Sequence, residues 1–402
     1  MAVHLRELLA ERKQAKDDSR SLLIRTIMAK SGSQTYLSRR TGLSAATVST
    51  IVREFAEKRW VKVTQVRNES HVEIAQTTGA AVGVELGFRH AAVVARRAEH
   101  GYEDAKIELR KVGAALGSSR WLPGVTEAIR DAVGELGEEE IAAIGLAVPR
   151  VVNPHNGKLM PPALPPWNAG EDPAAMLFDE LRTGGKVRIV APSVVLDNDA
   201  NLAAFAESVY AFPDAEILIG IKASTGIGAG IVIGGKKFRG AIGVAGEIGH
   251  LVVEQGGKFC SCGGRGCLET IIGADALVEQ AKTVLAGQKL STYDELADLV
   301  QKAVQGNVAC RRVLEEAART LGSAIGNLCN MLNPNVVVLG GAFGREDAVN
   351  FTLAPCREAL ERSAMRSAVK GDGFKLEPSQ VKHAAAHGAL MVAFEGTSYV
   401  AA

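Results

Sequence analysis

Residues 246–269, GEIGHLVVEQGGKFCSCGGRGCLE, restrict the fold more than any other stretch, because four of their side chains can bind one metal ion. His250, Cys260, Cys262 and Cys267 follow the spacing H-x9-C-x-C-x4-C. One imidazole and three thiolates fill a tetrahedral zinc site and leave no position for water, so the predicted zinc is structural. The alternative is a chance cluster of thiols in a mobile loop.

Two glutamates flank this predicted zinc loop. A bound ion would fix Glu247 and Glu269 relative to each other. If one ring nitrogen of His250 binds the metal, the other is oriented towards a ligand. The loop therefore predicts a rigid frame for carboxylates that bind hydroxyl groups.

The other three cysteines are scattered, and they indicate a reducing compartment. They lie in apolar or helical segments and are predicted to be packed thiols: Cys310, Cys329 and Cys356. Paired cysteines of a secreted framework would be spread more evenly. Residues 1–14 lack the apolar centre of a signal peptide, and no window approaches ~18 apolar residues. We therefore expect a cytoplasmic protein without membrane contact.

The N-terminal segment is basic and has the pattern of a winged helix-turn-helix domain, residues 1–76. Residues 1–70 contain 14 Lys and Arg and 7 Asp and Glu, a net charge of +7 in a chain of net charge +1. Helical periodicity starts near Ser19, with Leu22, Leu23, Ile27 and Met28 along one face. A short helix is predicted over 34–40, and Ser44 caps the next helix after a turn at Gly42. Residues 60–76 alternate like a hairpin, a predicted wing.

The helix capped by Ser44 has a small, polar outward face that fits the major groove of double-stranded DNA. Its inward face is apolar: Val48, Ile51, Val52 and Phe55. The residues predicted to contact an operator are Arg39, Arg40, Ser44, Ala45, Thr47, Ser49, Thr50, Arg53 and Arg67. The alternative is a small basic helical domain that binds another protein.

The body, residues 80–402, is predicted to be α/β with mixed sheets, because apolar strands alternate with amphipathic helices at 277–285 and 310–331. A polar connector is predicted at 77–79. The Gly-rich turn at 223–235 can line a phosphate with hydroxyl and N–H groups, or it is a structural hairpin.

The stretch VLDNDANLAAF suggests a ligand site at the end of a strand. A strand over 194–196 is predicted to enter a helix that starts with Asp197, Asn198 and Asp199. Ligands of open α/β sheets bind where strands end, and a carboxylate there can accept a proton from a hydroxyl group. The alternative is that these residues only cap the helix.

These motifs together resemble the ROK family (repressors, open reading frames, kinases), from about Ala80 to the C-terminus. The resemblance implies an actin-like, ribonuclease H-like two-lobed ATPase fold, and the winged helix matches the repressor branch. It implies sugar contacts at Asn198, Asp199, Glu247, His250 and Glu269, with Asp199 as the catalytic base in the kinase branch. It also implies nucleotide contacts at Ser224, Thr225, Gly226, Gly228, Gly340 and Gly341.

Two departures from the family pattern argue against a kinase. Glu85 stands where the first phosphate loop has aspartate, and Arg89 replaces its hydroxyl residue. Phosphoryl transfer depends on positioning and charge compensation around the phosphates, so a degenerate loop should impair it. In the sugar-side loop, residues 163–167 read ALPPW, and Ala163 replaces the usual asparagine.

We therefore expect a transcriptional repressor of carbohydrate metabolism, a homodimer or homotetramer that binds an operator and a sugar or sugar derivative. The alternative is a glucokinase-like sugar kinase, dependent on ATP and Mg²⁺, with an added DNA-binding domain. A third hypothesis is a regulator that has lost its small ligand and responds to a protein partner.

Overall fold

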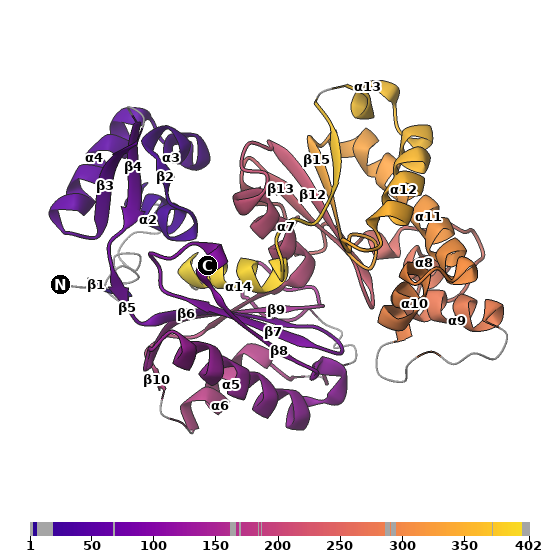
Figure 1. The fold of residues 1–402 in the computed structure, drawn as a ribbon, viewed down its shortest axis with the longest axis horizontal. Helices are drawn as coiled ribbons and strands as arrows, with labels where there is room; N and C mark the ends of the chain where they lie inside the picture. The colour runs from indigo at the N-terminus through magenta and orange to yellow at the C-terminus, as the bar shows by residue number, and fades with distance from the viewer. Residues whose placement is uncertain are drawn as a thin grey trace. The chain divides into compact units, whose positions relative to one another are not determined.

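The computed structural model describes residues 3–5, 19–66, 69–160, 166–168, 170–183, 185, 187–285, 290, 295–371 and 373–395. The chain forms two compact units (Figure 1). Unit 1 comprises residues 1–202 and 385–402, and unit 2 comprises residues 203–384. Within the described residues, every helix is too short or too polar to cross a membrane.

Residues 19–74 of unit 1, here called the N-terminal module, contain three helices and an antiparallel three-stranded sheet of order β2-β4-β3. These are α2 (Ser19–Ala29), β2 (Gly32–Ser33), α3 (Gln34–Thr41), α4 (Ala45–Glu57), β3 (Val61–Val66) and β4 (Glu69–Ile74). The predicted cap and turn are confirmed. The Oγ of Ser44 accepts a hydrogen bond from the N–H of Thr47 at 3.1 Å, and Gly42 has a φ of 73°. Glycine adopts this left-handed conformation without steric cost.

The apolar faces of α4 and α2 form the core of the N-terminal module. All four residues predicted for the inward face of α4 are buried. On α2 the prediction is partly wrong, because Leu22 is only half-buried and Ile24 is buried in its place. The buried stripe of α2 is Leu23, Ile24, Ile27 and Met28. The pair Leu23 and Ile24 and the pair Ile27 and Met28 are separated by about one helical turn, so the four side chains lie on one face.

The large sheet of unit 1 has the order β8-β7-β6-β9-β11, and β10 pairs with the start of β9. Its strands are β6 (Ala80–Leu86), β7 (Ala91–Arg96), β8 (Lys106–Arg110), β9 (Glu140–Val148), β10 (Arg188–Ile189) and β11 (Val194–Asn198). β6, β9 and β11 are parallel, whereas β6, β7 and β8 form an antiparallel meander. Unit 1 also contains η2 (Tyr102–Asp104), η3 (Ala114–Leu116), α5 (Ser118–Glu135), α6 (Pro173–Thr183) and α14 (Ala384–Glu395).

Unit 2 repeats this strand order as β14-β13-β12-β15-β16. Its strands are β12 (Ile217–Ala223), β13 (Ile227–Ile233), β14 (Lys236–Lys237), β15 (Val336–Gly341) and β16 (Lys375–Pro378). As in unit 1, β12, β13 and β14 form an antiparallel meander, and β15 and β16 are parallel to β12. Its helices are η4 (Ile248–His250), α8 (Glu269–Ile272), α9 (Ala274–Val284), α10 (Glu295–Val304), α11 (Val308–Leu332), α12 (Val349–Ser363) and α13 (Arg366–Val369).

The predicted α/β body with mixed sheets is confirmed, and α9 and α11 cover the two helices expected at 277–285 and 310–331. In both units the carboxyl ends of three parallel strands meet at one edge of the sheet. Ligands of α/β sheets bind at such edges. α7 (Asp199–Tyr210) begins in unit 1 and continues into unit 2.

Two local predictions are wrong. The connector expected at 77–79 contains β5 (Thr77–Thr78), which pairs in parallel with β1 (Val3–His4). The strand expected at 194–196 continues as β11 to Asn198, because Asp197 and Asn198 pair with the end of β9. The helix therefore starts at Asp199 and not at Asp197.

Candidate metal centre and ligand-binding residues

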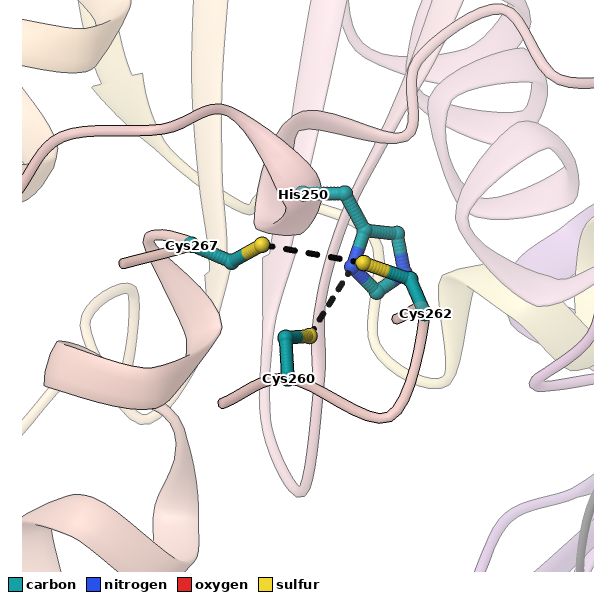
Figure 2. A group of neighbouring side chains, drawn as sticks. All are labelled: His250, Cys260, Cys262 and Cys267. Carbon is teal, nitrogen blue, oxygen red and sulfur yellow. Dashed lines mark hydrogen bonds between the residues drawn. The ribbon is translucent and has the colours of Figure 1, made fainter. Parts of the chain in front are cut away.

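The structure brings together the four predicted metal ligands of unit 2 (Figure 2). One ligand atom from each of His250, Cys260, Cys262 and Cys267 lies within 4.8 Å of the others. The Sγ of Cys260 is 3.5 Å from the Nδ1 of His250, and the Sγ atoms of Cys262 and Cys267 are 3.7 Å apart. The ligands thus come from η4 and from the loop that precedes α8.

These separations fit a tetrahedral metal centre. Zinc–sulfur bonds of about 2.3 Å and zinc–nitrogen bonds of about 2.0 Å at a tetrahedral angle place two sulfurs about 3.8 Å apart and sulfur and nitrogen about 3.5 Å apart. The two measured distances agree with these values. The donor atoms therefore have both the chemistry and the spacing of a closed structural site.

Tight backbone turns hold the thiols in place. The N–H of Cys260 donates to the carbonyl of Gly264 at 2.9 Å, and the N–H of Gly263 donates back to the carbonyl of Cys260 at 3.0 Å. The N–H of Gly264 also points to the Sγ of Cys262 at 3.4 Å. A main-chain N–H group directed at sulfur stabilises a thiolate, as second-layer groups do around metal ligands.

The protonation of the cluster differs between its thiols in the metal-free protein. Burial and the neighbouring thiols raise the pKa of Cys267 to about 12, while the N–H of Gly264 lowers the pKa of the exposed Cys262. Metal binding must displace the proton of a buried thiol, so uptake of a metal releases protons.

The imidazole of His250 joins the cluster to Glu247. Its Nδ1 faces the thiols, and its Nε2 lies 3.8 Å from the Oε2 of Glu247. One ring nitrogen thus faces the metal ligands and the other faces a carboxylate, as in other metal-binding histidines. Glu247 itself is only half-buried.

The predicted nucleotide-contact residues of unit 2 meet at the ends of β12 and β15. Gly341 pairs with Ala223, directly before the turn at Ser224–Gly226, and the N–H of Ala342 donates to the carbonyl of Ala223 at 2.7 Å. Gly228 lies inside β13 and not in the turn.

Glu269 lies beside the same turn. Its Oε2 accepts a hydrogen bond from the N–H of Ile227 at 3.1 Å. A Cβ added to Gly226 would lie 2.7 Å from this oxygen, so the turn and the carboxylate are in close contact. Glu269 therefore supports the β12–β13 turn, in addition to its predicted contact with a sugar.

In unit 1, Asn198 and Asp199 lie at the carboxyl end of β11. The Oδ1 of Asn198 accepts from the N–H of Asn201 at 3.0 Å, and its Nδ2 donates to the carbonyl of Arg150 at 3.2 Å. Asn198 therefore caps the start of α7, which is the structural role given above as the alternative to ligand binding. The Oδ1 of Asp199 accepts from the N–H of Ala200 at 2.8 Å, and Asp199 is buried.

The departures from the family pattern lie at or near the same sheet edge. Glu85 is buried near the end of β6, 4.0 Å from the Nε2 of His90, and Arg89 lies in the turn that follows. Trp167 is packed in the core of unit 1. Residues 163–165, which include Ala163, are outside the described residues, as is Arg67 of the predicted wing.

The outward face of α4 is exposed. Ala45, Ala46, Ser49, Thr50 and Arg53 are all accessible to solvent. The hydroxyl groups of Ser44 and Thr47 lie 2.8 Å apart, and the hydroxyl of Thr50 donates to the carbonyl of Ala46. Within the described part of the chain, no ion pair holds the guanidinium of Arg53. Arg39 is exposed and Arg40 is half-buried on α3.

No sequence motif indicates Arg150, whose carbonyl accepts a hydrogen bond from the side chain of Asn198. It follows the end of β9, so the general position of ligand sites at strand ends was the signal that would have pointed to it.

Comparison with known proteins covers most of the chain. Residues 81–395 match the sequence profile of the ROK family. A putative xylose repressor from Caldicellulosiruptor sp. (strain Rt8B.4) is 28% identical over 351 residues, which are 81% of this chain and 83% of that protein. A glucokinase from Thermotoga maritima is 31% identical over 281 residues, 66% of this chain and 84% of that enzyme.

The crystal structure of a ROK family transcriptional regulator, a homologue of the E. coli MLC protein, has the same fold. Its TM-score is 0.68 at 20% identity, and the match covers 94% of this chain and 96% of that one. This likeness shows the actin-like fold of such regulators and sugar kinases.

Proposed function

Because the chain belongs to the ROK family, we propose that it is a DNA-binding transcriptional regulator, a repressor whose body responds to a sugar or sugar derivative. The observation that carries this proposal is the exposed, small-residue face of α4 in a basic module joined to a ROK body. The putative xylose repressor, which is similar over 81% of this chain, supports the same assignment.

We assign residues 1–76 to a winged helix-turn-helix domain and residues 80–402 to the sugar-responsive domain. α4 would lie in the major groove, with Ala45 and Ser49 near the bases and Arg53 on a base edge or phosphate. Arg39 and Arg40 would contact phosphates, and the β3–β4 hairpin would be the wing. An operator with two half-sites requires a dimer or a tetramer built from dimers.

The effector would bind through polar side chains at strand ends and beside the metal ligands. Asn198 and Asp199 at the end of β11 offer amide and carboxylate groups to sugar hydroxyls, and Glu247, His250 and Glu269 offer further groups from unit 2. We propose that structural zinc, held by His250 and the three cysteines, fixes the position of these last residues. Titration calorimetry of the full chain against neutral sugars and sugar phosphates tests the effector class. Absence of heat with every sugar would favour regulation by a protein partner.

Loss of the Arg53 guanidinium tests the proposed DNA contact. Sites bound in the genome are first mapped, and the affinity of the purified protein for these duplexes is measured by fluorescence anisotropy. We expect Arg53→Ala to weaken binding by about 1–3 kcal/mol at fixed salt, the usual cost of a lost base contact, with the thermal stability of the body unchanged.

Arg25→Ala is the matched control, because it removes the same charge from α2 and leaves α4 intact. Its effect should be smaller than that of Arg53→Ala. Equal affinity of Arg53→Ala and wild type would remove Arg53 from the interface.

A sugar kinase is the second candidate. Asp199 is buried at the start of α7, and Ser224 and Thr225 follow Ala223, which pairs with Gly341 at the end of β15. These observations support the candidate, because ligands of α/β sheets bind at strand ends. Glu85 and Arg89 in the first phosphate loop oppose it. An ATP-coupled assay over a panel of sugars decides between the two, because sustained turnover that Asp199→Asn abolishes would establish an enzyme.

A further inference from the structure

The C-terminal helix α14 lies directly on the backbone of the unit 1 sheet (Figure 1). A Cβ added to Gly83 on β6 would lie 2.1 Å from the carbonyl oxygen of Ala386, and one added to Gly145 on β9 would lie 1.9 Å from that of Ala389. Only glycine permits this close approach of helix and strands. α14 is therefore fixed on β6 and β9.

The N-terminal module shares an apolar core with α14 and the sheet. One cluster of buried side chains includes Leu23 and Ile27 of α2, Val94 of β7, and Leu390 and Phe394 of α14. α2 of the predicted DNA-binding domain is thus packed against the body, and the described part of the N-terminal module is not a free domain on a linker.

Arg96, the last residue of β7, lies in the middle of this contact and is 1% exposed. Its Nη2 donates to the carbonyl of Met28 at 2.7 Å, and its Nη1 donates to the carbonyl of His100 at 2.6 Å. Its guanidinium carbon lies 5.0 Å from the ring centre of Phe394. Two further carbonyls, those of Arg97 and Ala98, accept at 3.2 Å.

The contacts of Arg96 connect several elements at the interface between the N-terminal module and α14, here called the Arg96 interface. No carboxylate among the described residues pairs with this buried charge, so main-chain carbonyls and an aromatic face compensate it. The carbonyl of Met28 belongs to the last turn of α2, where carbonyl groups have no partner within the helix. Arg96 thus connects the end of α2, the turn at 97–100 and the ring of Phe394.

The segment that leads into α14 is hydrogen-bonded to Glu207 on α7. The Oε1 of Glu207 accepts from the Oγ of Ser379 at 2.6 Å, and from the N–H groups of Gln380 and Val381 at 3.0 and 3.1 Å. α7 begins at Asp199, a predicted sugar contact. One helix therefore extends from the predicted effector residues to the segment that enters α14.

We propose that Arg96 is a positioning residue that fixes the N-terminal module on α14, so that a displacement of α14 moves the DNA-binding helix with it. This proposal rests on the proposed function. A protein whose DNA-binding module is flexibly tethered would bind half-sites at many spacings, whereas a fixed module selects one spacing.

Hydrogen–deuterium exchange of the full chain, measured without DNA, tests the Arg96 interface. In Arg96→Gln we expect the amides of α2 and residues 97–100 to lose protection, while α4 and β9 keep theirs. Arg97→Gln is the matched control, because Arg97 pairs with Glu138 at 2.7 Å and, among the described residues, its side chain forms no hydrogen bond or ion pair with α2. Unchanged protection of α2 in folded Arg96→Gln overturns the proposal.

A second variant covers the case in which Arg96→Gln does not fold. Phe394→Leu keeps an apolar side chain and removes the ring beneath the guanidinium, and it should loosen α2 in the same direction. Equal loss of protection over all of unit 1 would identify a purely structural role and contradict the proposal.

The second readout is the spacing of half-sites. Duplexes selected in vitro by the wild-type protein receive one to three extra base pairs at their centre. We expect Arg96→Gln to reduce the discrimination between spacings by between about 2-fold and 30-fold. If Arg96→Gln discriminates between half-site spacings as well as the wild type does, the proposed role of Arg96 is wrong. If the wild type binds no duplex, the proposed function fails, and the exchange experiment still decides the role of Arg96.

Discussion

Cys262 is the one exposed thiol of the metal cluster, and its loss tests the zinc site. A serine hydroxyl is a poor zinc ligand, so Cys262→Ser should reduce the metal content from about one ion per chain towards zero. It should also weaken the response to a sugar, while binding of DNA by the N-terminal module remains. Metal content is measured by mass spectrometry of the digested protein.

Ser261→Ala is the control for this change, because Ser261 is an exposed neighbour in the same loop that supplies no ligand. Metal content in Cys262→Ser equal to that of Ser261→Ala would show that the four side chains do not hold an ion.

Glu207 makes stability depend on pH. Burial raises its pKa above the ordinary 4.5, and the hydrogen bonds from Ser379, Val381 and Gln380 only partly offset this. A folded-state pKa above the unfolded value means that its stabilising contribution is complete below pH 4.5 and is lost as pH rises through the folded pKa. Glu207→Gln removes this dependence and can still accept the three bonds.

The expected result is a melting temperature of Glu207→Gln, relative to wild type, that increases as the pH is raised from about 4.5 to 7. Thermal unfolding followed by circular dichroism at several pH values measures it. A constant difference across this range would show that Glu207 keeps its ordinary pKa in the folded protein.

The sequence predicts some of these residues and not others, and the reason is their separation along the chain. The four metal ligands lie within residues 250–267, so their spacing could be read directly. Arg96 and Met28 are 68 residues apart, and Glu207 and Ser379 are 172 apart. Neither pair has a local pattern that indicates contact, and an arginine at the end of an apolar strand is not expected to be buried.

The contact between α14 and the sheet leads to a prediction about elements. A methyl group at position 145 would overlap the carbonyl of Ala389, so Gly145→Ala should lower the free energy of unfolding by about 1–3 kcal/mol. Gly134→Ala on α5 is the control, since nothing lies within 4 Å of an added Cβ there. This control should stabilise by up to about 1 kcal/mol. Denaturant unfolding of both variants measures the difference.

Elements with strong local signals were predicted well. Gly42, Ser44 and the apolar stripe of α4 fix a turn, a cap and a helix face from neighbouring residues alone. The end of β11 was misplaced because Asp197 and Asn198 favour helix caps, and their pairing with β9 outweighs that preference. β5 was missed because its partner, β1, is only two residues long and lies more than 70 positions earlier.

At the scale of the whole molecule, the fold class follows from the alternation of strands and helices, and the common strand order of the two units does not. Each order depends on which strand lies beside the first, and this is set by pairing between distant segments. From the sequence alone, residues 1–76 are expected to form a domain separate from the body. The shared core of α2, β7 and α14 became visible only in three dimensions.

The place of α14 as the last described element affects how the protein is made. During synthesis the sheet of unit 1 and the N-terminal module leave the ribosome long before α14, which shares an apolar core with both. Domains generally begin to fold as they emerge. Here unit 1 keeps an open apolar face until α14 has been made, because a growing chain without Phe394 lacks part of the buried cluster against which α2 packs.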